Sequence, residues 1–203
     1  PGQADPDHDW GLTGHTVAVC VARAEPYKRQ DLVLRAIPSV VAACPDVRFL
    51  FVGTGVYEPY LRELARALDV TKYVVFAGYV PHSEIPRVMR LADVALCPTD
   101  SEGLPLVLLE AMASGKPVVA SACPPYDSIV QHRVNGLVVP NEPEVFAEAI
   151  IRILEDPAFG NRLGQMGRQT AADYPWDLTV TRTAEFLERR VERLADVLGV
   201  MPL

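Results

Sequence analysis

The 203-residue sequence has no long apolar run and no excess of basic residues. No stretch approaches the roughly 20 consecutive apolar residues that a membrane-spanning helix needs, so we expect no such helix. The formal net charge of −7 argues against general nucleic-acid binding. The first ten residues are polar and acidic, and we therefore expect no signal peptide.

Cysteine is scarce, and its spacing excludes the common metal motifs. The four cysteines are Cys20, Cys44, Cys97 and Cys123, and no C-x-x-C occurs. Cys20 and Cys97 fall in apolar runs, as small core residues do. We therefore expect a reduced, cytoplasmic protein. The sequence also has no His/Cys/Asp cluster with ligand spacing, and we expect no bound metal or other cofactor.

The composition is that of an ordinary globular domain. Apolar residues make up 49% of the chain and charged residues 22%, and the length suits a single domain with a substantial core. Residues 1–14 are rich in Pro, Gly and Asp without periodicity, which indicates a linker or N-terminal tail. We place the folded domain at residues 15–198 and a C-terminal tail at 199–203.

Short apolar runs alternate with segments of helical spacing along the whole domain. The expected strands are Thr16–Ala22, Arg48–Val52, Tyr73–Ala77, Val94–Cys97, Val118–Ala120 and Gly136–Val139. The expected helices are Gln30–Ala43, Glu58–Leu68, a short one capped by Ser83 and ending near Leu91, Pro105 to Gly115, Glu144–Leu154, Ala158–Ala172 and Asp177–Leu198. This alternation predicts an α/β, three-layer, Rossmann-like domain with a six-stranded parallel sheet flanked by helices.

The residues that stand out from the apolar pattern, together with Val80, all follow expected strands. They are Arg23 and Lys28 after the first strand, Gly53 and Gly55 after the second, Tyr79 and Val80 after the third, and Glu102 after the fourth. Ligands of parallel sheets bind at the carboxyl ends of the strands, near the point where strand order reverses. The sequence therefore predicts that these loops converge on one site.

The stretch from Ser101 to Lys116 combines a loop with an almost wholly apolar helix, which we expect to be buried on most sides. Pro105 suits the first helical position and Gly115 suits a left-handed helix end. Glu102 precedes the unpaired N–H groups of the first turn, where anions bind. Glu102 could equally be a solvated loop residue.

Glu110 is the polar exception within this helix. It shares a face with Leu106, Leu109 and Ala113, and a carboxylate on an apolar face is costly unless a partner hydrogen-bonds it. That partner could be a ligand, a core arginine or the backbone.

The run EGLPLVLLEAMASGKPVVAS closely resembles the E-x7-E signature of retaining glycosyltransferases of family 4, which have the GT-B fold. Arg23 and Lys28 fall on the basic positions of the family's G-R-x4-K-G, although Ala22 and Arg29 replace its glycines. Phe76–Val80 is similar to the family's F-x-G-x-V, and Asn135–Pro140 also matches. The segment Cys123–Asp127 departs from the family pattern, so that loop is expected to have a different shape.

The resemblance implies a role for each matching residue. Glu102, Arg23 and Lys28 would be the catalytic set, with Glu102 on the donor sugar and the two cations on the departing diphosphate. The donor-binding set would be Gly103, Leu104 and Leu106 facing sugar and phosphates, Glu110 on the ribose hydroxyls, Tyr79 and Val80 at the base, and Gly53 as a close-approach turn. The turn at Gly53 could also be purely structural.

The family's enzymes have two such domains, and this chain resembles the C-terminal, donor-binding half. The resemblance implies metal-independent hexosyl transfer with retention of configuration, from a nucleotide-diphosphate sugar to an acceptor. Asp5-Pro6-Asp7 is formally a metal-binding D-x-D, but it lies in a polar terminus and not after a buried strand, so we reject it. The implied partner is an N-terminal acceptor-binding domain, through which the enzyme could touch a membrane, and we expect the chain alone to be inactive.

Two alternatives remain open at this point. One is a stand-alone nucleotide-sugar-binding module or regulatory subunit, and the other, less favoured, is half of a sugar-nucleotide epimerase. The base, the sugar and the acceptor are not specified by the sequence.

Overall fold

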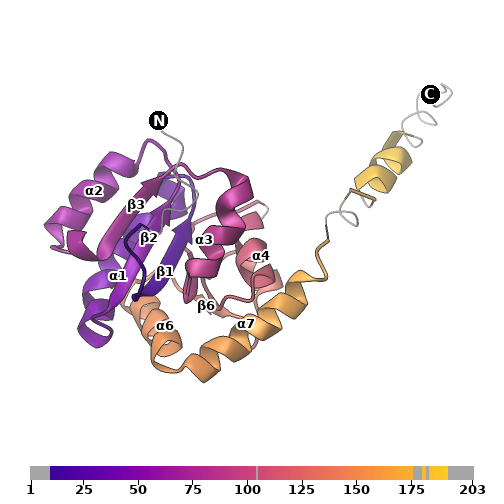
Figure 1. The fold of residues 1–203 in the computed structure, drawn as a ribbon. Coiled ribbons are helices and arrows are strands. Elements are labelled where there is room, and N and C mark those ends of the chain that lie inside the picture. Colours follow the sequence, from indigo (N-terminus) through magenta and orange to yellow (C-terminus); the bar gives the residue numbers. More distant parts are fainter. Residues whose placement is uncertain (1–9, 104, 176–179, 182, 192–203) are drawn as a thin grey trace.

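The computed structural model describes residues 10–103, 105–175, 180–181 and 183–191 (Figure 1). Within these residues a single parallel sheet has the strand order β3-β2-β1-β4-β5-β6. The strands are β1 (Thr16–Val21), β2 (Val47–Val52), β3 (Val74–Gly78), β4 (Val94–Cys97), β5 (Val118–Ser121) and β6 (Leu137–Val139). The order reverses between β1 and β4, which is the ligand-binding position of a Rossmann-like sheet. The expected fold class is confirmed.

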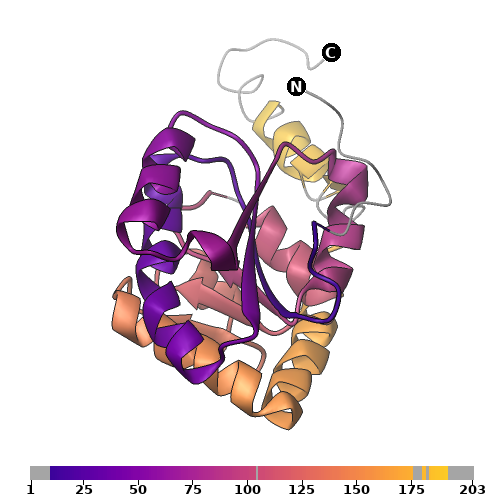
Figure 2. The ribbon, with the colours of Figure 1, turned by 60° about the vertical axis from the view of Figure 1, so that its left-hand side comes forward.

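Helices cover both faces of the sheet. The α-helices are α1 (Gln30–Ala43), α2 (Glu58–Ala67), α3 (Ile85–Leu91), α4 (Leu106–Ala113), α5 (Tyr126–Ile129), α6 (Pro143–Glu155) and α7 (Pro157–Ala171). Three single turns of 3-10 helix are η1 (Pro26–Lys28), η2 (Thr71–Tyr73) and η3 (His82–Glu84). Figures 1 and 2 show α1 and α2 on one side of the sheet and α3 and α4 on the other, which gives three layers.

The alternation of side chains along β1 divides the core in two. Ala18 and Cys20 point into the cluster formed with α1, α2 and α6, whereas Val17 and Val19 point into the cluster formed with α3, α4 and α5. Successive side chains of a strand face opposite ways, so a strand covered on both faces is apolar at every position. This explains why the strands could be recognised as short apolar runs.

Two expected helix starts are wrong, each because a proline sets the boundary. Ser83 does not cap α3; it lies inside η3, and Glu84 is the N-cap of a helix with proline in its first positions. Pro105 is the N-cap of α4 and not its first residue, since its ψ of 62° is not helical. The expected stop at Gly115 is confirmed by its φ of +71°.

Most residues of α4 are buried or half-buried, as expected, but one face of the helix is exposed. Leu108, Ala111 and Met112 are buried in the core, but Leu106 is 38% exposed and Ala113 is exposed. The face that carries Glu110 is therefore open in this chain. A carboxylate on that face keeps some contact with solvent, which lowers the cost we expected for it.

The structure adds detail at both ends of the described chain. Trp10 packs against the core and Leu12 is buried in it, so apolar packing begins before β1. Residues 180–181 and 183–191 are helical and exposed. The remainder of the expected helix Asp177–Leu198, residues 1–9 with their D-x-D, and the tail at 199–203 lie outside the described residues. None of the described helices is long and apolar enough to cross a membrane.

Candidate functional site

A cavity of about 240 Å³ opens where the exit loops of β1 and β4 meet, at the reversal of strand order. Three of the expected catalytic residues, Arg23, Lys28 and Glu102, line it together with Leu106 at the start of α4. The rest of its wall comes from Val21, Ala22, Tyr27, Leu96, Cys97, Pro98, Val107 and Tyr126. The convergence of strand-exit loops is thus confirmed for β1 and β4.

Lys28 and Glu102 form an ion pair across the cavity although they are 74 residues apart in the chain. Lys28 Nζ donates to Glu102 Oε2 at 2.5 Å, and the side chains are only 16% and 17% exposed. Glu102 Oε1 accepts from the backbone N–H of Gly103 at 3.1 Å. Glu102 is therefore not a solvated loop residue: it is held by a cation and an amide. An ammonium has three N–H donors, so Lys28 keeps two after bonding Glu102.

Arg23 is held by the aromatic residue that lies between the two cations in sequence. Arg23 Nη2 donates to the hydroxyl of Tyr27 at 2.7 Å, and Lys28 Nζ lies 5.3 Å from the centre of the same ring. Such a cation over a ring face is attracted to it. Tyr27 thus positions both basic side chains of the cavity, with the Arg23 side chain exposed at its mouth.

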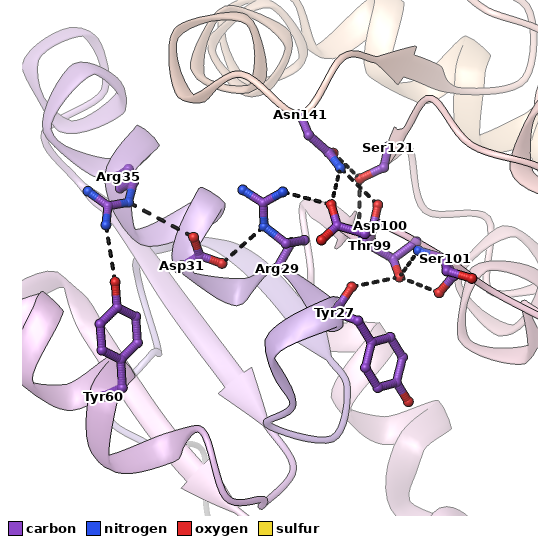
Figure 3. A network of polar contacts seen from close by, with 10 residues as sticks. All are labelled: Tyr27, Arg29, Asp31, Arg35, Tyr60, Thr99, Asp100, Ser101, Ser121 and Asn141. Carbon is purple, nitrogen blue, oxygen red and sulfur yellow. Dashed lines mark hydrogen bonds and ion pairs between the residues drawn. The ribbon is translucent and has the colours of Figure 1, made fainter.

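A polar network fixes the β1 exit loop against the end of β5 and the loops that follow β4 and β6 (Figure 3). The carbonyl of Tyr27 accepts from Thr99 Oγ1 at 3.1 Å and from the N–H of Asp100 at 2.8 Å. Thr99 N–H in turn donates to Ser121 Oγ at 2.8 Å. Asn141 donates to Thr99 O and Asp100 Oδ1, both at 3.0 Å. Lys28 and Glu102 therefore meet on loops tied together through four strand ends.

The glycine turn after β2 packs directly on the β1 exit loop. A Cβ on Gly53 would lie 2.1 Å from Ala22 O, and one on Gly55 would lie 2.2 Å from Ala24 O. The N–H of Ala24 also bonds Thr54 O at 3.0 Å. The two glycines permit an approach that any side chain would block, so they support the loop that carries Arg23. Gly53 does not line the cavity itself, and its contact with a donor stays a prediction.

Arg29, which stands at the second glycine position of the G-R-x4-K-G pattern, has a left-handed backbone conformation of the kind that glycine favours. Its φ is +44° and its ψ is 34°, a left-handed geometry that non-glycine residues avoid. The guanidinium donates to Asp100 Oδ1 at 2.7 Å and to Asp31 Oδ1 at 3.3 Å. The hydrogen bond to Asp100 raises the Arg29 pKa above its ordinary value. The loop therefore keeps a glycine-like turn, held by ion pairs of the arginine.

Glu110 lies on the open face of α4 and contacts a histidine. His82 Nε2 is 2.6 Å from Glu110 Oε1, with His82 84% and Glu110 30% exposed. Neither residue lines the cavity, and the same holds for Tyr79 and Val80 on the β3 exit loop. Tyr79 is 64% exposed while Val80 is buried in the core. Leu104, expected to face the donor, lies outside the described residues.

The start of α4 offers free backbone donors beside the cavity. No side chain among the described residues caps this helix, and its first turn contains no acidic residue. The N–H groups of a first helical turn have no partner within the helix and attract anions. With Arg23 and Lys28 opposite, the cavity is suited to a phosphate-bearing ligand.

The floor of the cavity is built from neutral, buried groups. Burial raises the pKa of the Cys97 thiol to about 12, and burial also raises the pKa of the Tyr126 hydroxyl far above its ordinary value. Both groups stay protonated near pH 7, so neither is an activated nucleophile. In the described part of the chain, no group of three or more His, Cys, Asp or Glu side chains is placed to hold a metal ion.

Sequence reasoning missed three residues of the site: Tyr27, His82 and Tyr126. The motif marks only the charged positions Arg23 and Lys28, and Tyr27 between them is uncharged. His82 could have been found as the first polar side chain after the third strand and its exit loop. Tyr126 lies in the segment that departs from the family pattern, so no motif pointed to it.

Known proteins share sequence with most of this chain. Residues 8–170 match the sequence profile of a family described as glycosyl transferases group 1. A GDP-mannose-dependent alpha-(1-6)-phosphatidylinositol monomannoside mannosyltransferase of Mycolicibacterium smegmatis is 35% identical, over 90% of this chain and 50% of that protein. A D-inositol 3-phosphate glycosyltransferase 2 of Catenulispora acidiphila is 32% identical, over 88% of this chain and 44% of the relative.

Solved structures also match this chain over part of their length. Anabaena Alr3699/HepE in complex with UDP-glucose superimposes with a TM-score of 0.81 and 26% identity, over 89% of this chain and 50% of that one. The C-terminal domain of LpcC from Francisella tularensis superimposes with a TM-score of 0.70 and 20% identity, over 86% of its length. The chain therefore spans about half the length of the curated relatives it matches, and it has the fold of that C-terminal domain.

Proposed function

Because this chain belongs to the glycosyl transferases group 1 family, we propose that its cavity binds the nucleotide-diphosphate sugar of a retaining glycosyltransferase. The observation that carries the proposal is the contact between Lys28 and Glu102 beside Arg23. It combines two cations, a carboxylate and an uncapped helix start in one small cavity. A sugar diphosphate needs these groups: donors for phosphate oxygens and an acceptor for sugar hydroxyls.

In the proposed reaction the protein acts mainly by stabilising the charge that develops on the departing diphosphate. Arg23 offers a planar pair of N–H donors, and Lys28 offers the two N–H groups that Glu102 leaves free. The N–H groups at the start of α4 add the positive end of the helix dipole. Charge stabilisation of this kind, by donors fixed in advance, is usually the largest catalytic term. We propose that these groups suffice without a metal ion.

Glu102 is proposed to accept hydrogen bonds from hydroxyls of the donor sugar, and not to attack the sugar. Its carboxylate is fixed by Lys28 and by the N–H of Gly103. Hydrolases that use a carboxylate nucleophile need a second carboxylic group on the opposite side of the bond. The other carboxylate of the motif, Glu110, does not line the cavity.

The first donor to test is GDP-mannose, because several relatives are named as GDP-mannose-dependent mannosyltransferases. UDP-glucose is the second, since it is bound in the structure of HepE. We propose that an N-terminal half, of the kind that the matched relatives possess, supplies the acceptor site. On that proposal the present chain binds the donor but does not transfer the sugar alone.

Calorimetric titration of the chain with GDP, UDP and ADP tests the proposal. We expect one nucleotide to bind, and Lys28→Ala and Arg23→Ala each to weaken it by about tenfold or more, the cost of losing a charge-assisted hydrogen bond. Arg162→Ala is the matched control, because Arg162 is an exposed arginine on α7 beside Phe159 and does not line the cavity. A folded chain that binds no nucleotide, or unchanged affinity in both cavity variants, would contradict the proposal.

A further inference from the structure

His82 in η3 contacts Glu110 in α4, and this contact lies outside the cavity. Their side-chain atoms Nε2 and Oε1 are 2.6 Å apart. A carboxylate can only accept a hydrogen bond, so Nε2 carries the proton and donates it. In the described part of the chain the Glu110 carboxylate makes no other hydrogen bond or ion pair, so Oε2 can accept a hydrogen bond from a ligand hydroxyl.

The two side chains of this pair differ in their exposure to solvent. His82 is 84% exposed, so its ring contributes little to the core, whereas Glu110 is 30% exposed and partly covered. An exposed ion pair of this kind adds little to fold stability. What the contact does fix is the rotamer of Glu110, and it ties α4 to the segment that leaves β3 through Tyr79 and Val80.

We infer that His82 is a positioning residue for the ribose of the donor, acting through Glu110. His82 holds one oxygen of the carboxylate so that the other accepts from the ribose hydroxyls. This inference rests on the proposed function, since it requires that the chain bind a nucleotide, and on the ribose-binding role that the motif resemblance implies for Glu110. It adds a recognition element that the E-x7-E motif does not contain, because His82 comes from a different loop.

Calorimetric affinities for GDP and 2′,3′-dideoxy-GDP test this inference. If UDP binds more tightly than GDP, UDP and 2′,3′-dideoxy-UDP are used in their place. We expect His82→Ala to weaken GDP by about fivefold, the effect of one misplaced hydrogen bond, and to leave the dideoxy analogue unchanged. His82→Gln should restore the preference for ribose, because glutamine Nε2 lies as many bonds from Cα as histidine Nε2. His132→Ala is the control, since that histidine bonds Val138 O at the far edge of the sheet.

A double-mutant cycle then shows whether His82 acts through Glu110. In a Glu110→Ala background the substitution His82→Ala should have no further effect on GDP affinity. Equal weakening of GDP and its dideoxy analogue, or an undiminished effect of His82→Ala without Glu110, would overturn the inference alone. If the wild-type chain binds no nucleotide, the proposed function fails, and the inference fails with it. Thermal unfolding of each variant shows that the fold is intact.

Discussion

Tyr27 organises the charged side of the cavity through a neutral side chain. Its hydroxyl accepts from Arg23, its ring lies under Lys28, and its carbonyl is held by Thr99 and Asp100. Two cations in one loop repel each other, and a fixed acceptor between them lowers the cost of holding both in place. We therefore expect Tyr27 to affect donor binding although its side chain is uncharged.

Tyr27→Phe tests this role at the scale of one hydroxyl. The substitution removes the acceptor of Arg23 and keeps the ring under Lys28, so we expect nucleotide affinity to fall by about three- to tenfold with little loss of stability. Tyr60→Phe is the matched control, because the Tyr60 hydroxyl also accepts from an arginine, Arg35, at 3.1 Å and lies outside the cavity. Calorimetry would speak against the role if both variants bound the nucleotide equally well.

Arg29 carries a backbone penalty that its side chain offsets. Its left-handed φ of +44° costs a non-glycine residue about 1 kcal/mol or more, and its bonds to Asp100 and Asp31 return some of that free energy. Both Arg29→Gly and Arg29→Ala lose the hydrogen bonds of the guanidinium, but only glycine also removes the backbone strain. We therefore expect Arg29→Gly to be more stable than Arg29→Ala by about 1 kcal/mol. Urea unfolding measures the difference; an alanine variant as stable as the glycine variant would contradict this account.

At the scale of single residues, the charged members of the site could be predicted and their neighbours could not. Arg23, Lys28 and Glu102 carry chemistry that a motif preserves at fixed spacing. Tyr27 contacts Arg23 and Lys28 within one loop, and His82 contacts Glu110, 28 residues further along the chain, at distances that the folded backbone sets. A sequence pattern does not contain those distances.

Among the elements, α7 is held against the end of α4 by a row of glycines. A Cβ on Gly164 would lie 2.1 Å from Gly115 O, and one on Gly167 would lie 3.5 Å from the Met112 side chain. Figure 1 shows α7 running beside α4 at the edge of the domain. This packing fixes the turn at which α4 ends, and hence the axis of the helix whose start faces the cavity.

Gly164→Ala tests the packing of these two helices. The added methyl must push α7 away from a backbone carbonyl, and overpacking of this kind costs about 1–3 kcal/mol. Met166→Ala is the control on the same helix, because Met166 is 40% exposed and surface changes cost within about 0.5 kcal/mol. Chemical unfolding that gave the two variants the same stability would show that the close approach is not required.

The strands could be predicted at this scale, and helix starts less well. Buried parallel strands are apolar at every position, so the run at β1 was recognisable without any partner. Helix starts depend on local competition among prolines and turns, as at Pro105 and Ser83. The open face of α4 could not be foreseen, because helix sequence alone does not show which neighbours cover it.

For the whole molecule, the buried acids near the site predict how stability changes with pH. The ordinary pKa of a cysteine thiol is near 9.0, and burial raises the Cys97 pKa to about 12. Burial raises the pKa values of Cys20 and Tyr126 in the same direction. The unfolded chain therefore releases these protons at lower pH than the folded chain does. Stability should fall as pH rises from 9 towards 12, by up to about 1.4 kcal/mol per pH unit for each group.

Urea unfolding at pH 8 and at pH 10.5 checks this direction. Cys97→Ala removes one of the buried acids, so its stability should fall less steeply over that interval than that of the wild-type chain. If the two slopes were equal, the Cys97 thiol would not be protonated in the folded chain in the way the structure requires.

The central claim is that a nucleotide diphosphate binds between the β1 and β4 exit loops, and a crystal structure of the chain with its tightest-binding nucleoside diphosphate tests it most directly. We predict diphosphate oxygens within hydrogen-bonding distance of Arg23, Lys28 and the first N–H groups of α4. A second hollow, of about 400 Å³ beside α2, is lined by Gly55, Glu58, Pro59, Arg62 and Arg66 and also offers two arginines. A nucleotide bound there, with the first cavity unoccupied, would contradict the account.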